Sequence, residues 1–178
     1  MGRISAGRGR WRRSGVSKDV VIRRLGAGDV VLLRALMACF ADAFEDPQHY
    51  VKALPSDAYL ADLLANDGFV ALVALAAEHV VGGLTAYDLP KPERAHSELY
   101  LYDLAVAESH RRRGLATALI AALHRIASAR QAAIVYVQAD PEDEAAVALY
   151  TNLGTGRDVL HFDLMPPGDP LASGDGAR

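Results

Sequence analysis

The feature that most constrains the fold is a glycine that joins an apolar strand to a helix. Residues 97–106 are expected to form a long strand, and residues 114–129, mostly Ala and Leu, a helix that starts at Gly114. The first N–H groups of such a helix have no intrahelical partner, and the helix dipole adds partial positive charge there. The junction therefore predicts an anion site, best suited to a phosphate or pyrophosphate.

The residues around this junction suit that role. Glycine permits positive φ or close approach of a ligand to the backbone, and arginine adds charge at the rim. The pattern is not a P-loop, because no Gly-Lys-Ser/Thr follows, and it lacks the three glycines of a dinucleotide fingerprint. A solvated basic turn in front of a surface helix is the alternative. The predicted phosphate-binding residues are Arg111, Arg112, Arg113, Gly114, Leu115, Ala116 and Thr117.

The remaining hydrophobic pattern predicts an α/β domain with a mixed central sheet flanked by helices. Asp46-Pro47 is interpreted as the break after the first helix, and Glu78-His79 as a hairpin turn. The expected strands are residues 20–22, 69–77, 80–87, 97–106, 134–137 and 159–164, and the expected helices are 30–43, 55–65, 114–129 and 143–153.

Composition favours one globular domain. Of 178 residues, 51% are hydrophobic and 23% are charged, which is ordinary for a globular chain. We expect a basic flexible extension over 1–18, the domain over 19–165 and a flexible tail over 166–178. No run of eighteen apolar residues predicts a membrane span, and no apolar core of a signal peptide follows the basic start. With Cys39 as the single cysteine, interpreted as core packing, a cytoplasmic location is expected.

Charge is divided unevenly along the chain. Through Arg24 there are eight Lys/Arg and one Asp, a net charge of +7, whereas the remainder has 11 Lys/Arg and 21 Asp/Glu, a net charge of −10. An acidic body attracts cationic ligands. The basic arm lacks the aromatic interleaving of a nucleic-acid module, so no nucleic-acid partner is expected.

Two motifs resemble those of the GNAT acetyltransferase superfamily. Arg111-x-x-Gly114-x-Ala116 is similar to its Arg/Gln-x-x-Gly-x-Gly/Ala signature, and Ala146-x-x-Leu149-Tyr150-x-x-x-Gly154 to its second signature. Longer stretches within 20–164, at 97–106, 136–140, 146–150 and 161–163, look like aminoglycoside 3-N-acetyltransferases of the gentamicin type. The chain departs from the general family pattern at Asp143, where Asn is frequent, and at Thr155, where Phe is usual.

The resemblance implies direct transfer of acetyl from acetyl-coenzyme A to an amine, without a covalent enzyme intermediate. The histidines are scattered without the spacing of metal ligands, so no metal is expected. It implies that the 97–106 strand splays from its neighbour near Asp103 and admits the pantetheine arm. Backbone amides of Leu104, Ala105 and Val106 would then bind the arm and the acyl oxygen. Tyr150 occupies the family's general-acid position, with a packed helix tyrosine as the alternative.

Asp103 is the candidate base that would deprotonate the amine. It is a carboxylate in an apolar strand, where an unpaired charge is costly. Strict alternation places it on one face with Leu99, Leu101 and Ala105. The alternatives are an Asp that pairs with a backbone group or an Arg, or one that binds the cationic substrate while water takes the proton.

A polycationic acceptor needs an acidic cleft, although each carboxylate alone is typical of an ordinary solvated surface. The sequence favours an aminoglycoside 3-N-acetyltransferase that confers antibiotic resistance, expected by resemblance to be a homodimer. The alternatives are acetylation of a polyamine, another small amine or a protein N-terminus, and a non-catalytic coenzyme A sensor. The candidate substrate-binding residues are Glu45, Asp46, Glu98, Tyr102, Asp103, Asp140, Glu142, Asp143 and Asp163.

Overall fold

The computed structural model describes residues 19–52 and 55–164, so the predicted extension over 1–18 and tail over 166–178 lie outside the described residues. Short 3-10 turns occupy Ala27–Asp29 and Glu108–His110. The helices and strands, in chain order, are β1 (Val20–Arg24), α1 (Val30–Ala43), α2 (Pro47–Tyr50), α3 (Asp57–Ala65), β2 (Phe69–Ala76), β3 (His79–Pro90), β4 (Ser97–Val106), α4 (Leu115–Ala129), β5 (Val135–Val137) and α5 (Glu144–Leu153).

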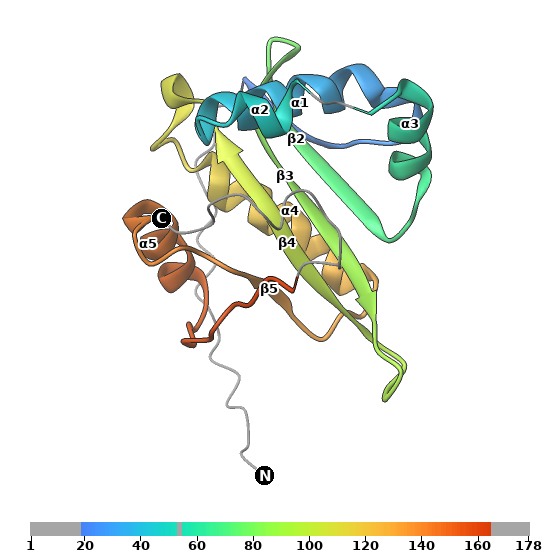
Figure 1. Cartoon of the computed structure of the whole chain (residues 1–178), viewed down its shortest axis with the longest axis vertical. Helices are drawn as coiled ribbons and strands as arrows, with labels where there is room; N and C mark the ends of the chain where they lie inside the picture. The colour runs from blue at the N-terminus through green and yellow to red at the C-terminus, as the bar shows by residue number, and fades with distance from the viewer. Residues whose placement is uncertain (1–18, 53–54, 165–178) are drawn as a thin grey trace.

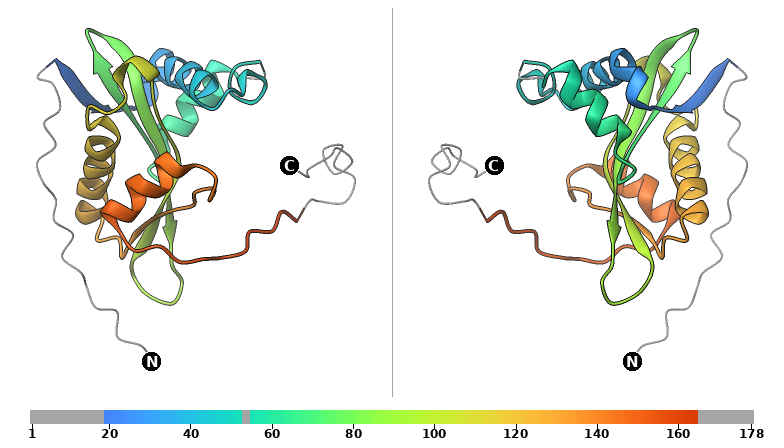
Figure 2. Two further views of the ribbon diagram at one scale, coloured as in Figure 1. Left: turned by 90° about the vertical axis from the view of Figure 1, so that its left-hand side faces the viewer. Right: turned by 90° about the vertical axis from the view of Figure 1, so that its right-hand side faces the viewer.

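The strands form one sheet in the order β1-β2-β3-β4-β5. Neighbours from β1 to β4 are antiparallel, whereas β4 and β5 are parallel, which confirms the predicted mixed sheet. Helices α1 and α3 cover one face of the sheet, and α4 covers the other (Figures 1 and 2). Helix α5 packs on the α4 side through Leu149, Tyr150 and Leu153.

Each face of the sheet has its own buried core. Leu119 and Leu123 of α4 are fully buried against Leu99 and Leu101 of β4. On the opposite face, Leu33, Leu36 and Phe40 of α1 pack with the sheet residues Ala71 and Val73. Burying a side chain of this size stabilises the fold by about 1.5–3 kcal/mol, so both layers contribute to the stability of the domain.

Gly83 lets α1 approach the sheet closely. A Cβ at this position would lie 2.4 Å from the carbonyl oxygen of Leu72 and 2.5 Å from Cδ1 of Leu36. Neither neighbour has room to move, because Leu72 belongs to a central strand and Leu36 is fully buried. The absence of a side chain at Gly83 therefore sets the spacing between α1 and β3.

An extra residue in β4 changes the face on which Asp103 lies. Thr85 pairs with Asp103 while the next residue of β3, Ala86, pairs with Leu101, so Tyr102 is bulged. Leu99 and Leu101 point into the α4 core, whereas Asp103 faces the α1 side. The expectation from strict alternation, that Asp103 shares a face with Leu99 and Leu101, is therefore wrong. Only Ala105 stays on the Asp103 face.

Most predicted elements agree with the structure, with two differences. The strand expected over 159–164 is absent, because this segment has no neighbouring strand among the described residues. The structure also adds α2, where Asp46-Pro47 had indicated only a break. Within the described ranges, no helix is both long and apolar enough to cross a bilayer.

We predict that Gly83→Ala lowers the free energy of unfolding by about 1–3 kcal/mol, because the added methyl overpacks the contact between α1 and the sheet. Urea denaturation followed by circular dichroism measures this change. Gly28→Ala is the matched control, since a Cβ there meets no atom within 4 Å, and it should stay within about 0.5 kcal/mol. Equal effects of the two substitutions would contradict the packing argument.

Candidate active site

Asp103 is half-buried and accepts two hydrogen bonds from hydroxyl groups. Tyr50 Oη donates to Oδ1 and Thr85 Oγ1 donates to Oδ2, each at 2.8 Å. Neither donor carries a charge, and within residues 19–52 and 55–164 no lysine or arginine forms an ion pair with Asp103. An ionised carboxylate has about four acceptor positions, and further positions therefore remain for an amine or a water.

Tyr50 is held over Asp103 by aromatic packing. Its ring lies 5.7 Å from that of Phe40 on α1 and 5.6 Å from that of Phe44, the residue that caps the end of α1. Burial, followed by the hydrogen bond to Asp103, raises the pKa of Tyr50, so its hydroxyl remains a donor. The short helix α2 thus closes one side of the site.

Four tyrosines continue the site along the same face of the sheet. We call Tyr87, Tyr100, Tyr102 and Tyr136 the tyrosine platform. Tyr102 contacts Tyr87 and Tyr100 edge-on, at centroid distances of 5.7 and 5.5 Å, and Tyr100 stacks on Tyr136 at 4.9 Å. Tyr102 is 59% exposed, and its location beside Asp103 makes the platform a surface on which a cation or a sugar ring can rest.

The predicted phosphate-binding residues form a backbone concavity at the start of α4. Arg112 has a φ of 62° and Gly114 a φ of 75°, so positive φ recurs within three residues. Gly114 is the N-cap without a side-chain cap, and Ala118 is the first residue whose N–H bonds into the helix. The amides of Leu115, Ala116 and Thr117 precede that bond and are available to an anion.

The splay predicted near Asp103 is present between β4 and β5. Their pairing ends at Leu101, which leaves the rest of this edge of β4 open. Ala107 N–H donates to the carbonyl of Val81 on β3, so residues that alternate with it, Leu104 and Val106, direct their N–H groups to the open edge. Ala105 directs its N–H to β3. Arg111 Nε donates to the Val106 carbonyl at 3.1 Å and links the edge to the concavity.

Tyr150 lies on α5 and packs against the α4-side core. Burial, reinforced by the Asp143 carboxylate, raises the pKa of Tyr150 to about 12. Its hydroxyl therefore keeps its proton at neutral pH. In this state it can donate a hydrogen bond to a nearby negative charge.

The structure gathers some of the candidate substrate-binding residues and separates others. Tyr102 precedes Asp103 in β4, and Asp46 caps the helix α2 that carries Tyr50, accepting the N–H of His49 at 3.0 Å. Glu98 lies five residues before Asp103 on β4, which is about 16 Å from Asp103 at 3.3 Å per residue. Its Oε2 lies 3.8 Å from Nζ of Lys91. Glu45 is exposed between α1 and α2.

The carboxylates of the C-terminal part serve local structure. Asp140 accepts the N–H of Glu142, and Asp143 caps α5 by accepting the N–H of Ala146. Asp163 is exposed and lies 3.0 Å from Nε2 of His161. Asp140 and Asp143 thus lie at the start of α5, whereas Asp163 is linked through His161 and Gln138 to Tyr100 of the tyrosine platform.

The sequence patterns missed Tyr50, Thr85 and most of the tyrosine platform. A signal for α2 was present, because Asp46 followed by Pro47 matches a helix N-cap with proline at the first position. No sequence motif indicated a role for Thr85, because it comes next to Asp103 only through the pairing of β3 with β4.

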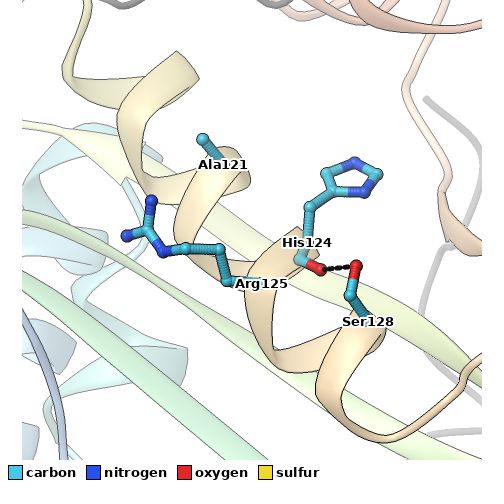
Figure 3. Close-up of a pocket in the computed structure, with 4 residues that line it drawn as sticks. All are labelled: Ala121, His124, Arg125 and Ser128. Atoms are coloured by element: carbon cyan, nitrogen blue, oxygen red, sulfur yellow. Dashed lines mark hydrogen bonds between the residues drawn. The ribbon is translucent and has the colours of Figure 1, made fainter. Parts of the chain in front are cut away.

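A shallow hollow on α4 lies apart from this site. It is lined by Ala121, His124, Arg125 and Ser128, which project from α4 as Figure 3 shows. Ser128 donates its hydroxyl hydrogen to the His124 carbonyl at 2.9 Å. The start of α4, Asp103 and Tyr150 do not line this hollow, so we do not assign it to the same site.

Comparison with known families gives one match that spans most of the chain. Residues 31–155 match the acetyltransferase (GNAT) family. Among curated proteins, N-acetyltransferase 8B of Rattus norvegicus is 31% identical over 107 residues, which cover 60% of this chain and 46% of that protein. The chain thus spans about half the length of this curated relative.

Two solved structures are similar over most of both chains. An aminoglycoside acetyltransferase from an uncultured soil metagenomic sample is 48% identical, with a TM-score of 0.81 and coverage of 83% of this chain and 98% of that one. A second aminoglycoside acetyltransferase from such a sample, in complex with sisomicin, is 29% identical with a TM-score of 0.77. The match covers 83% of this chain and 97% of that one.

Proposed function

We propose that this chain, which belongs to the acetyltransferase (GNAT) family, transfers an acetyl group from acetyl-coenzyme A to an amine of an aminoglycoside antibiotic, at the 3-N position as in the gentamicin type. The observation that carries the proposal is the doubly hydrogen-bonded Asp103 carboxylate between the tyrosine platform and the open edge of β4. The relatives that are aminoglycoside acetyltransferases support the substrate class.

On the donor side, acetyl-coenzyme A supplies the activated acetyl group. The pyrophosphate suits the concavity formed by residues 111–117, where unpaired amides and three arginines meet. The amides of Leu104 and Val106 face the open edge, where they can pair with an extended arm and stabilise an oxyanion. Ala105 does not donate a hydrogen bond to the arm, because its N–H faces β3.

On the acceptor side, Asp103 takes the proton of the attacking amine, directly or through one water. The hydroxyls of Tyr50 and Thr85 hold both carboxylate oxygens in place. Tyr150 donates a hydrogen bond to the leaving sulfur while it keeps its proton. The platform and Asp46 attract the other ammonium groups of a polycationic substrate.

An assay of acetyl-coenzyme A turnover with a panel of amines tests the function. The panel contains gentamicin, sisomicin, spermidine and a peptide with a free N-terminus. We expect turnover on the aminoglycosides, with mass spectrometry and NMR placing the acetyl group on the 3-amine. Turnover on spermidine or the peptide alone would replace the proposed acceptor, and coenzyme A binding without any turnover would indicate a sensor.

We predict that Asp103→Asn lowers kcat by about 10²-fold or more, as loss of a general base does, while the affinity for coenzyme A stays near that of the wild type. Steady-state kinetics and calorimetry measure the two quantities. Asp62→Asn, at an exposed position on α3, is the control. If KM for the aminoglycoside rises while kcat is kept, Asp103 binds the cation and is not the base.

We predict that Gly114→Val weakens coenzyme A binding at least tenfold. Valine is strained at a φ of 75°, and its branched side chain occupies the concavity. Calorimetry measures the affinity, and far-ultraviolet circular dichroism verifies that the variant is folded. Gly28→Val serves as the control because no atom lies within 4 Å of a Cβ there. Wild-type affinity in Gly114→Val would refute the phosphate assignment.

A further inference from the structure

The two hydroxyl groups that donate to Asp103 differ in their access to water. Thr85 is only 4% exposed and lies within the sheet, on β3. Tyr50 is half-buried and belongs to α2, whose other three residues are all exposed. This helix lies at the surface of the domain, near the end of β4 (Figure 1). One oxygen of the carboxylate therefore faces the interior, whereas the other faces a residue with a route to solvent.

A general base must release the proton that it takes before it can act again. This need rests on the proposed function, in which Asp103 takes the proton of the acceptor amine. When an amine fills the acceptor positions that remain on Asp103, Tyr50 and Thr85 are its other hydrogen-bond partners. A proton passed to Thr85 would meet no water, because that side chain is buried. Tyr50 is then the partner through which the proton can leave.

We propose that Tyr50 relays the proton from Asp103 to water in each turnover, whereas Thr85 only positions the carboxylate. In the ionised state, Tyr50 Oη donates its hydrogen to Oδ1. After Oδ1 has taken the amine proton, the tyrosine hydroxyl hydrogen turns to a water and Oη accepts from Oδ1. The O–H bond at Oδ1 then breaks as one forms at Oη, and the original Oη–H bond breaks as its proton joins the water.

The net change is one proton moved from the amine to solvent, with Asp103 charged and Tyr50 neutral again. Tyr50 suits such a concerted exchange. Burial, followed by the hydrogen bond to Asp103, raises its pKa, so a free tyrosinate does not accumulate. Packing against Phe40 and Phe44 holds the ring, and Oη stays 2.8 Å from Oδ1 while its hydrogen can rotate about the C–O bond.

Tyr50→Phe tests the relay, because it keeps the aromatic ring and removes only the hydroxyl group. We expect kcat to fall by about tenfold or more on the amine that the wild type acetylates, with circular dichroism unchanged. Imidazole at fixed pH and ionic strength should then raise kcat of the variant to a plateau, since a small base can carry the proton in place of Tyr50. The wild type should not respond. Mass spectrometry of the acetylated amine measures the rates.

Thr85→Val is the matched comparison, because it removes the other hydrogen bond to Asp103 and replaces the hydroxyl by a methyl group of similar size. It should also lower kcat, but imidazole should restore nothing, since this hydroxyl holds the carboxylate and carries no proton. A Tyr50→Phe variant that keeps its kcat, or loses it without a response to imidazole, overturns the relay. An equal response of both variants to imidazole does so too.

Asp103→Asn in the same assay separates failure of the relay from failure of the proposed function. If Asp103→Asn loses turnover while Tyr50→Phe keeps the wild-type kcat, the relay is wrong and acetyl transfer with Asp103 as the base stands. If the wild type acetylates no amine of the panel, the proposed function fails and the relay fails with it.

Discussion

The site depends on the bulge that Tyr102 makes in β4. With an even register, Asp103 would point with Leu99 and Leu101 into the core under α4, where a carboxylate without a partner costs several kcal/mol. The extra residue turns Asp103 to the opposite face, within reach of Tyr50 and Thr85. It also lies where the pairing with β5 stops, so one irregularity both aims the carboxylate and accompanies the opening of the edge.

Two halves of different character meet at this bulge. The half that suits a phosphorylated donor consists mainly of backbone groups, at the open edge of β4 and in the positive-φ turn before α4, with arginine side chains at its rim. The half that suits a cationic acceptor consists of side chains from α2, β3 and β4. The sheet between α1 and α4 carries both halves. The close contact at Gly83 fixes the distance between α1 and the sheet.

Sequence patterns predicted the features that depend on residues close together in the chain. Strand alternation and caps located nearly every helix and strand, and a glycine after a strand located the concavity at Gly114. The partners of Asp103 could not be predicted, because Tyr50 and Thr85 are 53 and 18 residues away in the sequence and depend on tertiary packing. The strand expected over 159–164 failed for a related reason, since a strand forms only where an edge receives it.

The backbone character of the donor half determines how substitutions affect it. Amides at Leu104, Val106 and the start of α4 are present whatever side chains those positions carry, so substitutions there affect the amides only through packing and backbone shape. Glycine at 114 is the exception, because its side chain is the hydrogen that the turn requires. Substitutions in α2 or the tyrosine platform therefore change the groups that face the acceptor, whereas conservative substitutions at Leu104 and Val106 leave the donor-side amides in place.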